Sequence, residues 1–235
     1  MNKVLLVGEN PTGPTGNGLF LRSILPQIDV TVADVSVFCP FSDYTPDLSV
    51  SNSLRIIPSD DLKRQDLWGT QKLLAILDSN ELDFVVFVGI DIWRYIEIIP
   101  HIKQIQQKRK FRLIHIFPYD LQYLDNEFVQ YANLMDIPCV YSQYGFDMLK
   151  DHVPNLRYFR PSMYDRELFY PYDEEKRQEV RSVIFPTVSP DTFIFGFIGP
   201  NQIRKDPQKL IKAFSLLKDK IDKKMVLYMH TNFKD

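Results

Sequence analysis

Short apolar runs alternate along this chain with longer segments whose apolar residues recur at helical spacing. The clearest run spans 83–89 (Asp-Phe-Val-Val-Phe-Val-Gly), and its apolar character at successive positions predicts a central strand buried on both faces. Further strands are predicted at 3–8, 30–38, 111–117, 138–142 and 156–160. This alternation is typical of a doubly wound α/β domain with a parallel sheet, whose ligands lie at the carboxyl ends of the strands.

The segments between these runs supply the helices. A helix is predicted to begin at Leu19, and others span 67–78, 92–109 and 143–152. Pro100 should kink or divide the third of these because it lacks an amide hydrogen and its ring clashes with the preceding turn.

The same pattern starts again after residue 170. A charged stretch bounded by prolines is interpreted as a helical linker, and 192–199 and 224–230 predict two more strands. Asp206 followed by Pro207 marks the start of a helix between them. Because two strands and one helix cannot bury their own faces, we expect an incomplete second domain. The expected organisation is an N-terminal domain at 1–170, a linker at 171–190 and the start of a C-terminal domain at 191–235.

Composition excludes several functional classes. The chain has 28 basic and 30 acidic residues, so its overall charge offers no attraction to nucleic acid. Two cysteines, Cys39 and Cys139, indicate no disulfide framework, and no Cys/His cluster has metal-ligand spacing. We therefore expect no metal and no bound cofactor. The apolar stretch Val4–Val7 is too short for a signal-peptide core or a membrane span, which predicts a cytoplasmic protein.

A glycine-rich loop, from Gly8 to Gly18, follows the first predicted strand. Pro14 stands where a P-loop has its lysine, and the glycine spacing reverses that of the dinucleotide fingerprint, so neither motif is present. The amides of Gly16, Asn17 and Gly18 could meet an anion at the N-terminus of the following helix. A plain turn is an interpretation of equal weight.

Two polar residues lie in or just beyond the strand predicted at 111–117. His115 stands among apolar neighbours and is predicted to be a core residue with satisfied hydrogen bonds, not a catalyst. Asp120 follows the strand end, where a parallel sheet presents its ligands, and is the better site candidate. Capping of the following turn is the alternative role for its carboxylate.

The stretch from Gly199 to Asp206 is the most informative part of the sequence. Arg204 and Lys205 stand beside a predicted helix N-terminus, directly after an apolar strand. The helix dipole, its free amides and two positive side chains together favour a phosphate group at this position.

A second basic cluster comprises Lys103, Lys108, Arg109, Lys110 and Arg112. A solvated helix end is the more frequent explanation of such a run. Peripheral contact with an anionic membrane surface is the alternative hypothesis.

Taken together, these motifs resemble the family-4 retaining glycosyltransferases of the GT-B fold over nearly the whole chain. Five segments carry the resemblance: a glycine loop with the first helix (15–25), an aspartate-bearing strand end (118–120), a serine followed by a helix (140–149), a passage in which Asp165, Phe169 and Pro171 keep the family spacing, and a phosphate-binding turn with its helix (198–214). None is specific alone, but their order and spacing match the family.

The resemblance implies transfer from a UDP- or GDP-sugar to a glycan, lipid or protein acceptor, with retention at the anomeric carbon and without a metal. Arg204 and Lys205 would hold the donor diphosphate and neutralise charge as the nucleotide leaves. Gly16 and Gly18 would let the first loop approach the donor phosphate or the acceptor closely. Asp120 is the catalytic candidate, and loops at 45–54 and 121–131 would select the acceptor.

Several positions depart from the family pattern. Met163 and Tyr164 replace the glycine and valine before Asp165, and the arginine frequent after Gly199 is absent. The family's Glu-x7-Glu motif, which contacts the donor sugar and ribose, would lie beyond Asp235. We therefore expect the chain alone to be inactive, with self-association through exposed sheet edges, or a partner chain that completes the second domain.

Two other functional classes stay open. A non-catalytic module that binds a glycan or a protein would differ from an enzyme fragment in having no donor domain in its gene or on a partner chain. A nucleotide-dependent oxidoreductase of Rossmann type is opposed by the reversed glycine spacing, and failure to bind NAD would dismiss it.

Overall fold

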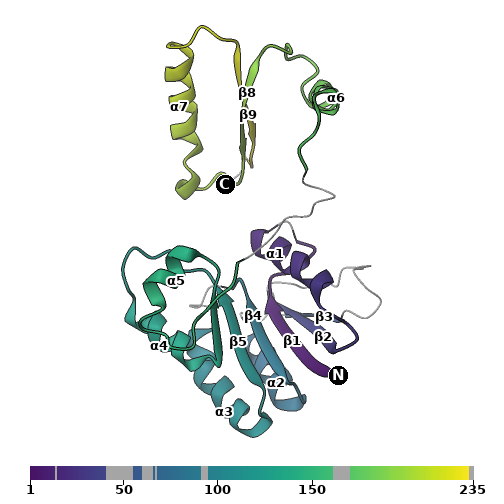
Figure 1. Ribbon diagram of the computed structural model, residues 1–235, viewed down its shortest axis with the longest axis vertical. Helices are drawn as coiled ribbons and strands as arrows, with labels where there is room; N and C mark the ends of the chain where they lie inside the picture. The colour runs from purple at the N-terminus through teal and green to yellow at the C-terminus, as the bar shows by residue number, and fades with distance from the viewer. Residues whose placement is uncertain are drawn as a thin grey trace. The chain divides into compact units, whose positions relative to one another are not determined.

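The chain forms two compact units, Met1–Arg166 and Glu167–Asp235, each built around a parallel sheet (Figure 1). The computed structural model describes residues 1–13, 15–40, 55–59, 66, 68–90, 95–160 and 170–232. The loop expected at 45–54 and the motif residues Asp165 and Phe169 lie outside these ranges. The boundary expected at 170 lies just after the division between the two units.

The first unit contains a seven-stranded parallel sheet in the order β3-β2-β1-β4-β5-β6-β7. Its strands are β1 Asn2–Gly8, β2 Ala33–Cys39, β3 Arg55–Pro58, β4 Phe84–Val88, β5 Arg112–Phe117, β6 Ile137–Val140 and β7 Arg157–Tyr158. The strand order reverses between β1 and β4, which pair in parallel from Val4↔Phe84 to Gly8↔Val88. In sheets of this kind, ligands bind where the order reverses, at the carboxyl ends of the strands.

Helices cover both faces of this sheet (Figure 1). Alternation along β1 sends Leu5 and Val7 to one face and Leu6 to the other. Leu6 packs with α1 (Gly16–Ile24), which is followed by the 3₁₀ turn η1 (Leu25–Gln27). The opposite face packs against α2 (Thr70–Ser79), α3 (Ile99–Arg109), α4 (Asn126–Leu134) and α5 (Gln143–Leu149). This confirms the predicted doubly wound α/β architecture, and each fully buried leucine contributes about 1.5–3 kcal/mol.

Pro100 lies in the first turn of a helix and does not kink it. The 3₁₀ turn η3 (Ile96–Ile98) leads into α3, and Pro100 lies in its first turn. The first turn has no intrahelical acceptor for an amide hydrogen there, so proline is accommodated without cost. The predicted kink at Pro100 is therefore wrong, although the segment is divided into a 3₁₀ turn and an α-helix just before it; residues 92–94 of the predicted helix lie outside the described ranges.

The segment 121–131, expected to be a loop, contains the first part of α4. The Asp125 carboxylate accepts a hydrogen bond from the Phe128 amide at 2.8 Å, which caps the helix. Phe128, Tyr131 and Ala132 are buried at helical spacing, which is the signal that the loop interpretation overlooked.

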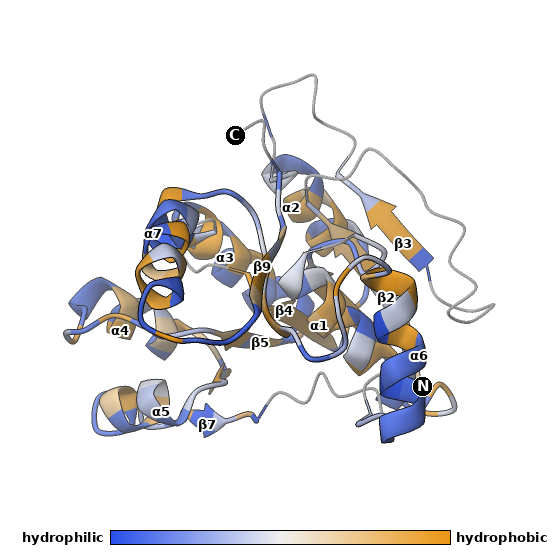
Figure 2. Ribbon diagram, turned by 90° about the horizontal axis from the view of Figure 1, so that it is seen from above, coloured by the Kyte–Doolittle hydropathy of each residue, from blue (hydrophilic) through white to orange (hydrophobic). Residues whose placement is uncertain are grey.

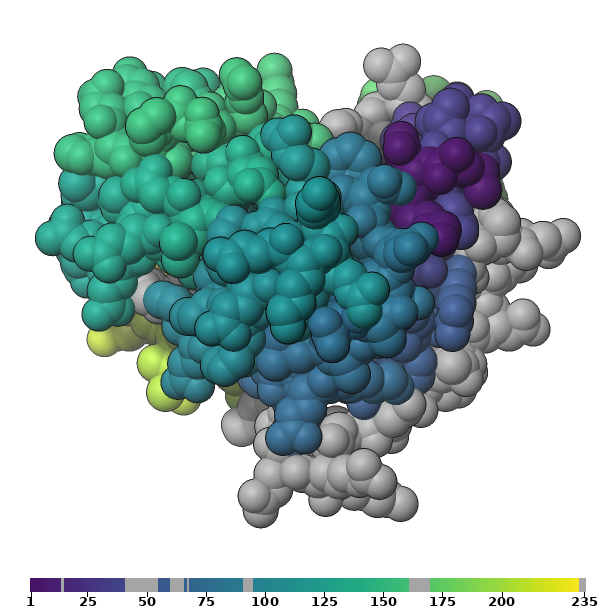
Figure 3. Space-filling model, turned by 90° about the horizontal axis from the view of Figure 1, so that it is seen from below, coloured from purple at the N-terminus to yellow at the C-terminus, as the bar shows by residue number. Residues whose placement is uncertain are grey.

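The basic cluster surrounds the C-terminus of α3. Figure 3 looks onto the adjoining surfaces of α2 (blue) and α3 (teal). The Lys103 Nζ lies 4.0 Å from the Asp136 Oδ1, whereas the cluster's other cations, Lys108, Arg109, Lys110 and Arg112, are exposed. Within the described ranges, no helix is long and apolar enough to cross a bilayer.

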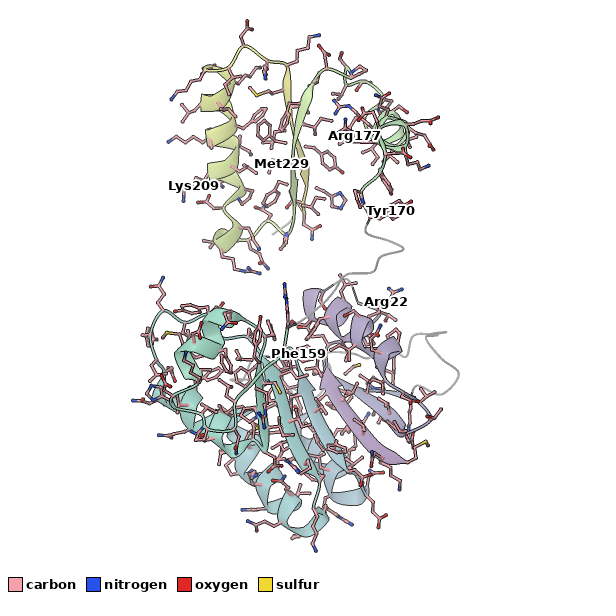
Figure 4. The ribbon with its side chains drawn as sticks, in the orientation of Figure 1. Arg22, Phe159, Tyr170, Arg177, Lys209 and Met229 are labelled. Carbon is pink, nitrogen blue, oxygen red and sulfur yellow. The ribbon has the colours of Figure 1, made fainter. Side chains whose placement is uncertain are left out.

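The second unit contains a two-stranded parallel sheet of β8 (Phe193–Ile198) and β9 (Met225–His230). Phe195 and its neighbour Leu227 share the face that α7 (Pro207–Lys218) covers, where the Phe195 and Phe214 ring centroids are 5.7 Å apart. Figure 4 shows Met229 on this same side, pointing from β9 toward α7. The turn η4 (Ile203–Lys205) connects β8 to α7.

The remaining helix of the second unit, α6 (Glu174–Ile184), is hydrophilic along most of its length (Figure 2). Asp173 caps it by accepting from the Lys176 amide at 2.8 Å, and none of its residues is buried. The Arg181 guanidinium donates to the carbonyls of Ser189 and Thr192, which ties the helix to the segment before β8.

Candidate functional site at the strand ends

The glycine-rich loop after β1 leads directly into α1 at the point where the strand order reverses. Thr15 caps the helix, since its Oγ1 accepts from the Gly18 amide at 3.1 Å. In the described part of the chain, the amides of Gly16 and Asn17 have no acceptor, and they belong to the positive end of α1. These two amides are therefore available to a ligand.

Gly16 and Gly18 have different reasons to be glycine. A Cβ on Gly18 would lie 2.5 Å from the Asn10 carbonyl oxygen and 2.8 Å from the Thr15 Oγ1. Among the described residues beyond its own helical turn, no atom lies within 4 Å of a Cβ built on Gly16. Gly18 thus serves the packing of the loop itself, and the open space beside Gly16 is compatible with a ligand.

Residues from two distant parts of the sequence, Glu9 and Asn17 on one side and Gly89 on the other, meet at this loop. The Asn17 Nδ2 donates to the Glu9 Oε1 at 3.2 Å. The Asn17 Oδ1 also lies against Gly89 after β4, where a Cβ would be only 3.0 Å away and where φ is +66°. The other carboxylate oxygen, Glu9 Oε2, is shielded from solvent and has no hydrogen-bond partner among the described residues.

His115 is a core residue, as predicted. Its side chain is only 1% exposed, its Nε2 is 3.0 Å from the Ile90 carbonyl oxygen, and its Nδ1 is 3.1 Å from the Tyr131 hydroxyl. Because a carbonyl only accepts, the Nε2 carries the proton and the Nδ1 accepts from Tyr131. Burial lowers the pKa of His115 to about 4, although the hydrogen bond to Ile90 opposes this shift.

This low pKa predicts a stability that falls as the solution becomes acidic. The unfolded histidine takes up its proton near pH 6.5, while the folded one resists protonation until about pH 4. The contribution of His115 to the free energy of unfolding is therefore fully present above pH 6.5. It is lost as the pH falls toward 4, and the total loss is about 3 kcal/mol. Urea unfolding at several pH values should show this loss.

The matched variant is His115→Gln, whose amide can still donate to the Ile90 carbonyl. Acidic side chains titrate in both proteins, so the difference between the two pH profiles isolates His115. Parallel profiles for the wild type and His115→Gln between pH 6.5 and 4 would contradict the prediction.

Asp120 lies beyond the end of β5 in an exposed position. The neighbouring Tyr119 hydroxyl donates to the Tyr123 carbonyl at 2.8 Å and accepts from the Asp125 amide at 3.1 Å, which holds the loop. Asp125, and not Asp120, caps α4. No hydrogen bond or ion pair engages the Asp120 carboxylate within the described ranges, so it is available to a ligand.

In the second unit, Arg204 and Lys205 are exposed on η4, between β8 and α7. The predicted roles of Asp206 as N-cap and Pro207 at the first helical position are confirmed. Asp206 takes up a left-handed conformation with φ 44° and ψ 57°, which is uncommon for a residue with a side chain. The cations therefore stand at the carboxyl end of a parallel strand, as the sequence predicted.

The start of α7 is less open to an anion than the sequence suggested. The Asp206 carboxylate accepts from the Lys209 Nζ at 2.7 Å and from the Lys209 amide at 3.1 Å, and these bonds lower the pKa of Asp206. Pro207 has no amide hydrogen, so Gln208 has the remaining available amide of this turn in the described structure. The Arg204 and Lys205 side chains must therefore supply most of the attraction for a phosphate.

The described residues at these strand ends include neither a group of metal ligands nor a reactive thiol. Over the described ranges, no group of three or more His, Cys, Asp or Glu side chains could hold a metal ion. Cys39 and Cys139 are buried and unpaired, and burial raises the pKa of Cys39 to about 12. The Cys39 thiol is therefore protonated at neutral pH and unreactive.

Comparison with known proteins finds similar structures but no similar sequence among family models or curated proteins. No protein-family model and no curated protein matches the sequence. The catalytic domain of Starch Synthase IV from Arabidopsis thaliana, bound to ADP and acarbose, aligns with a TM-score of 0.62 at 11% identity, over 98% of this chain and 69% of that one.

Two further solved structures agree with this match. An alpha-glucosyltransferase (AGT) in complex with UDP has a TM-score of 0.52 at 11% identity, over 97% of this chain and 58% of its own. The lipopolysaccharide outer core galactosyltransferase WaaB in its apo form has a TM-score of 0.52 at 12% identity, over 97% of this chain and 60% of its own. At this level of identity the likeness shows the fold alone, and the predicted α/β fold of GT-B type is confirmed.

Proposed function

We propose that this chain is the acceptor-binding and donor-phosphate-binding part of a glycosyltransferase. The enzyme would transfer a sugar from a UDP- or GDP-sugar to a glycan, lipid or protein acceptor with retention of anomeric configuration. The observation that carries the proposal is the pair of exposed cations, Arg204 and Lys205, on the turn between β8 and α7. The GT-B fold, shared with enzymes solved with ADP or UDP, supports it.

Charge neutralisation is the chemistry that this turn supplies. Cleavage of the bond between the sugar and the nucleotide leaves negative charge on the diphosphate. The planar guanidinium of Arg204 can donate two parallel hydrogen bonds to phosphate oxygens, and the Lys205 ammonium adds a point charge. Because both groups are in place before the bond breaks, they stabilise the transition state without reorganisation.

Direct titration of the chain with nucleotides tests this proposal. Calorimetry should detect binding of UDP or GDP with a dissociation constant on the order of 10⁻⁵ to 10⁻³ M. NAD, which lacks a terminal diphosphate, should not compete with either. Absence of any nucleoside diphosphate binding in the millimolar range, or equal binding of NAD, would show that the proposal is wrong.

Asp120 is proposed as the catalytic carboxylate. Asp120→Asn should lower turnover by about 100-fold or more in an enzyme that contains this chain, a loss typical of removed general acid–base or electrostatic groups. UDP affinity and the thermal midpoint should not change, because the side chain is exposed. A loss of activity that tracked a lower melting temperature would instead assign Asp120 a structural role.

A further inference from the structure

Tyrosines gather beyond the carboxyl ends of β5 and β6, the edge at which a parallel sheet presents its ligands. Tyr119 is buried, whereas Tyr123 is 64% exposed and Tyr144 is 49% exposed. Burial chiefly raises the pKa of Tyr119, and the nearby hydroxyls of Tyr144 and Tyr123 raise it further, so the three side chains are close together. Two exposed aromatic rings therefore share one region of the surface.

Hydrogen bonds hold the loop between β5 and α4 in place. The buried Tyr119 hydroxyl donates to the Tyr123 carbonyl, and the Tyr144 hydroxyl donates to the Leu121 carbonyl at 2.8 Å. The chain itself thus uses the polar end of Tyr144, while the Tyr123 hydroxyl has no partner among the residues that the structure describes. Because the loop is fixed in advance, a ligand that binds there need not order it.

The charge of this segment limits the kind of ligand. The sequence contains no lysine or arginine between Arg112 and Lys150, whereas the loop carries the exposed carboxylate of Asp120. A phosphate or a carboxylate would meet no cation of this segment and would be repelled by Asp120. Hydroxyl groups suit it better, because a carboxylate accepts their hydrogens and the exposed Gln122 amide both donates and accepts.

Exposed aromatic rings beside hydroxyl-binding groups match the two surfaces of a neutral sugar. One face of a pyranose carries C–H groups, which can pack against an aromatic ring, and its rim carries hydroxyls, which can bind to a carboxylate and an amide. The alkyl chain of a lipid would cover the rings but would leave the polar groups of Asp120 and Gln122 without partners. A sugar satisfies both kinds of side chain.

We propose that Tyr123 and Tyr144 form a stacking surface for one ring of a neutral sugar, whose hydroxyls bind to Asp120 and Gln122. The proposal rests on the proposed glycosyltransferase function only in identifying this sugar as part of the acceptor. It narrows the acceptor from a glycan, lipid or protein to an uncharged glycan.

Backbone-amide NMR of the full chain tests the proposal with three probes: methyl β-glucoside, methyl β-galactoside and methyl β-N-acetylglucosaminide. At least one should shift the amide resonances of Gln122, Tyr123 and Tyr144, with an affinity in the millimolar range. Tyr123→Ala should weaken this binding about tenfold, while Tyr123→Phe, which keeps the ring, should bind within about twofold of the wild type. Methyl β-glucuronide, which adds a carboxylate, should bind about tenfold more weakly than methyl β-glucoside.

The matched control is Tyr170→Ala, which removes a tyrosine of the second unit that is 52% exposed. It should leave glycoside binding unchanged, and thermal melting should show that Tyr123→Ala is folded. The proposal is overturned if none of the three glycosides shifts these resonances, if Tyr123→Ala binds them normally, or if the glucuronide binds as well as the glucoside. Glycoside binding by a chain that binds neither UDP nor GDP would support this site and count against the proposed function.

Discussion

Replacing Arg204 and Lys205 together by alanine should weaken the binding of UDP or GDP by roughly 100-fold. Each charge-assisted hydrogen bond to a phosphate is worth about 1.5–3 kcal/mol, and solvent around these exposed side chains reduces the sum. Asp206 and Pro207 leave few amides at the start of α7, so the helix cannot replace the lost cations. Calorimetric titration of both proteins measures the effect.

The control is the double variant Lys212→Ala/Lys218→Ala, which removes two exposed cations from the middle and the C-terminal end of the same helix. It makes the same change in net charge and should leave nucleotide affinity within about twofold, because it removes no phosphate contact. Equal losses in the two double variants would mean that net charge attracts the nucleotide, and that the turn before α7 has no special role.

Gly18→Ala should destabilise the first unit by about 2–4 kcal/mol. The added methyl group would lie 2.5 Å from a backbone oxygen of Asn10, and a backbone atom cannot move aside as a flexible side chain can. Both tryptophans of the sequence, Trp68 and Trp93, belong to this unit, so their fluorescence during urea unfolding reports its stability.

Gly16→Ala is the matched control, two residues earlier in the first turn of α1. In the described part of the chain, no atom beyond the same helical turn lies within 4 Å of the added methyl group, and alanine is favoured over glycine within a helix. Stability should therefore change by less than about 0.5 kcal/mol. Similar losses from the two substitutions would contradict the separate roles assigned to these glycines.

The main strands were predictable because each is a short apolar run between polar segments. For β4, β5, β8 and β9, the predicted strands overlap the observed ones and differ at each end by at most one residue. The four-residue edge strand β3 was not predicted, since a run that short carries too little pattern. The missed helix α4 did have local signals, an N-cap and apolar residues at helical spacing.

The candidate site could be predicted only in part. The cations and the cap at Asp206 were identifiable because they are consecutive in the sequence and follow an apolar run. The meeting of Glu9, Asn17 and Gly89 depends on parallel pairing of β1 with β4, which joins segments about 80 residues apart, and on side-chain positions. The occupation of the α7 amides by Asp206 likewise required the structure.

The hydrogen bonds of His115 join the interior of the first unit to the turns at the carboxyl ends of β1 and β4. Tyr131 on α4 contacts His115, His115 contacts Ile90, and the preceding residue Gly89 lies against the Asn17 side chain that holds Glu9. The structural effect of a substitution at Tyr131 would therefore reach the Glu9 carboxylate, which Tyr131 does not contact. The conformation of the turn at the end of β1 is therefore constrained by the packing of the core, and a change in packing can alter that turn without altering its own residues.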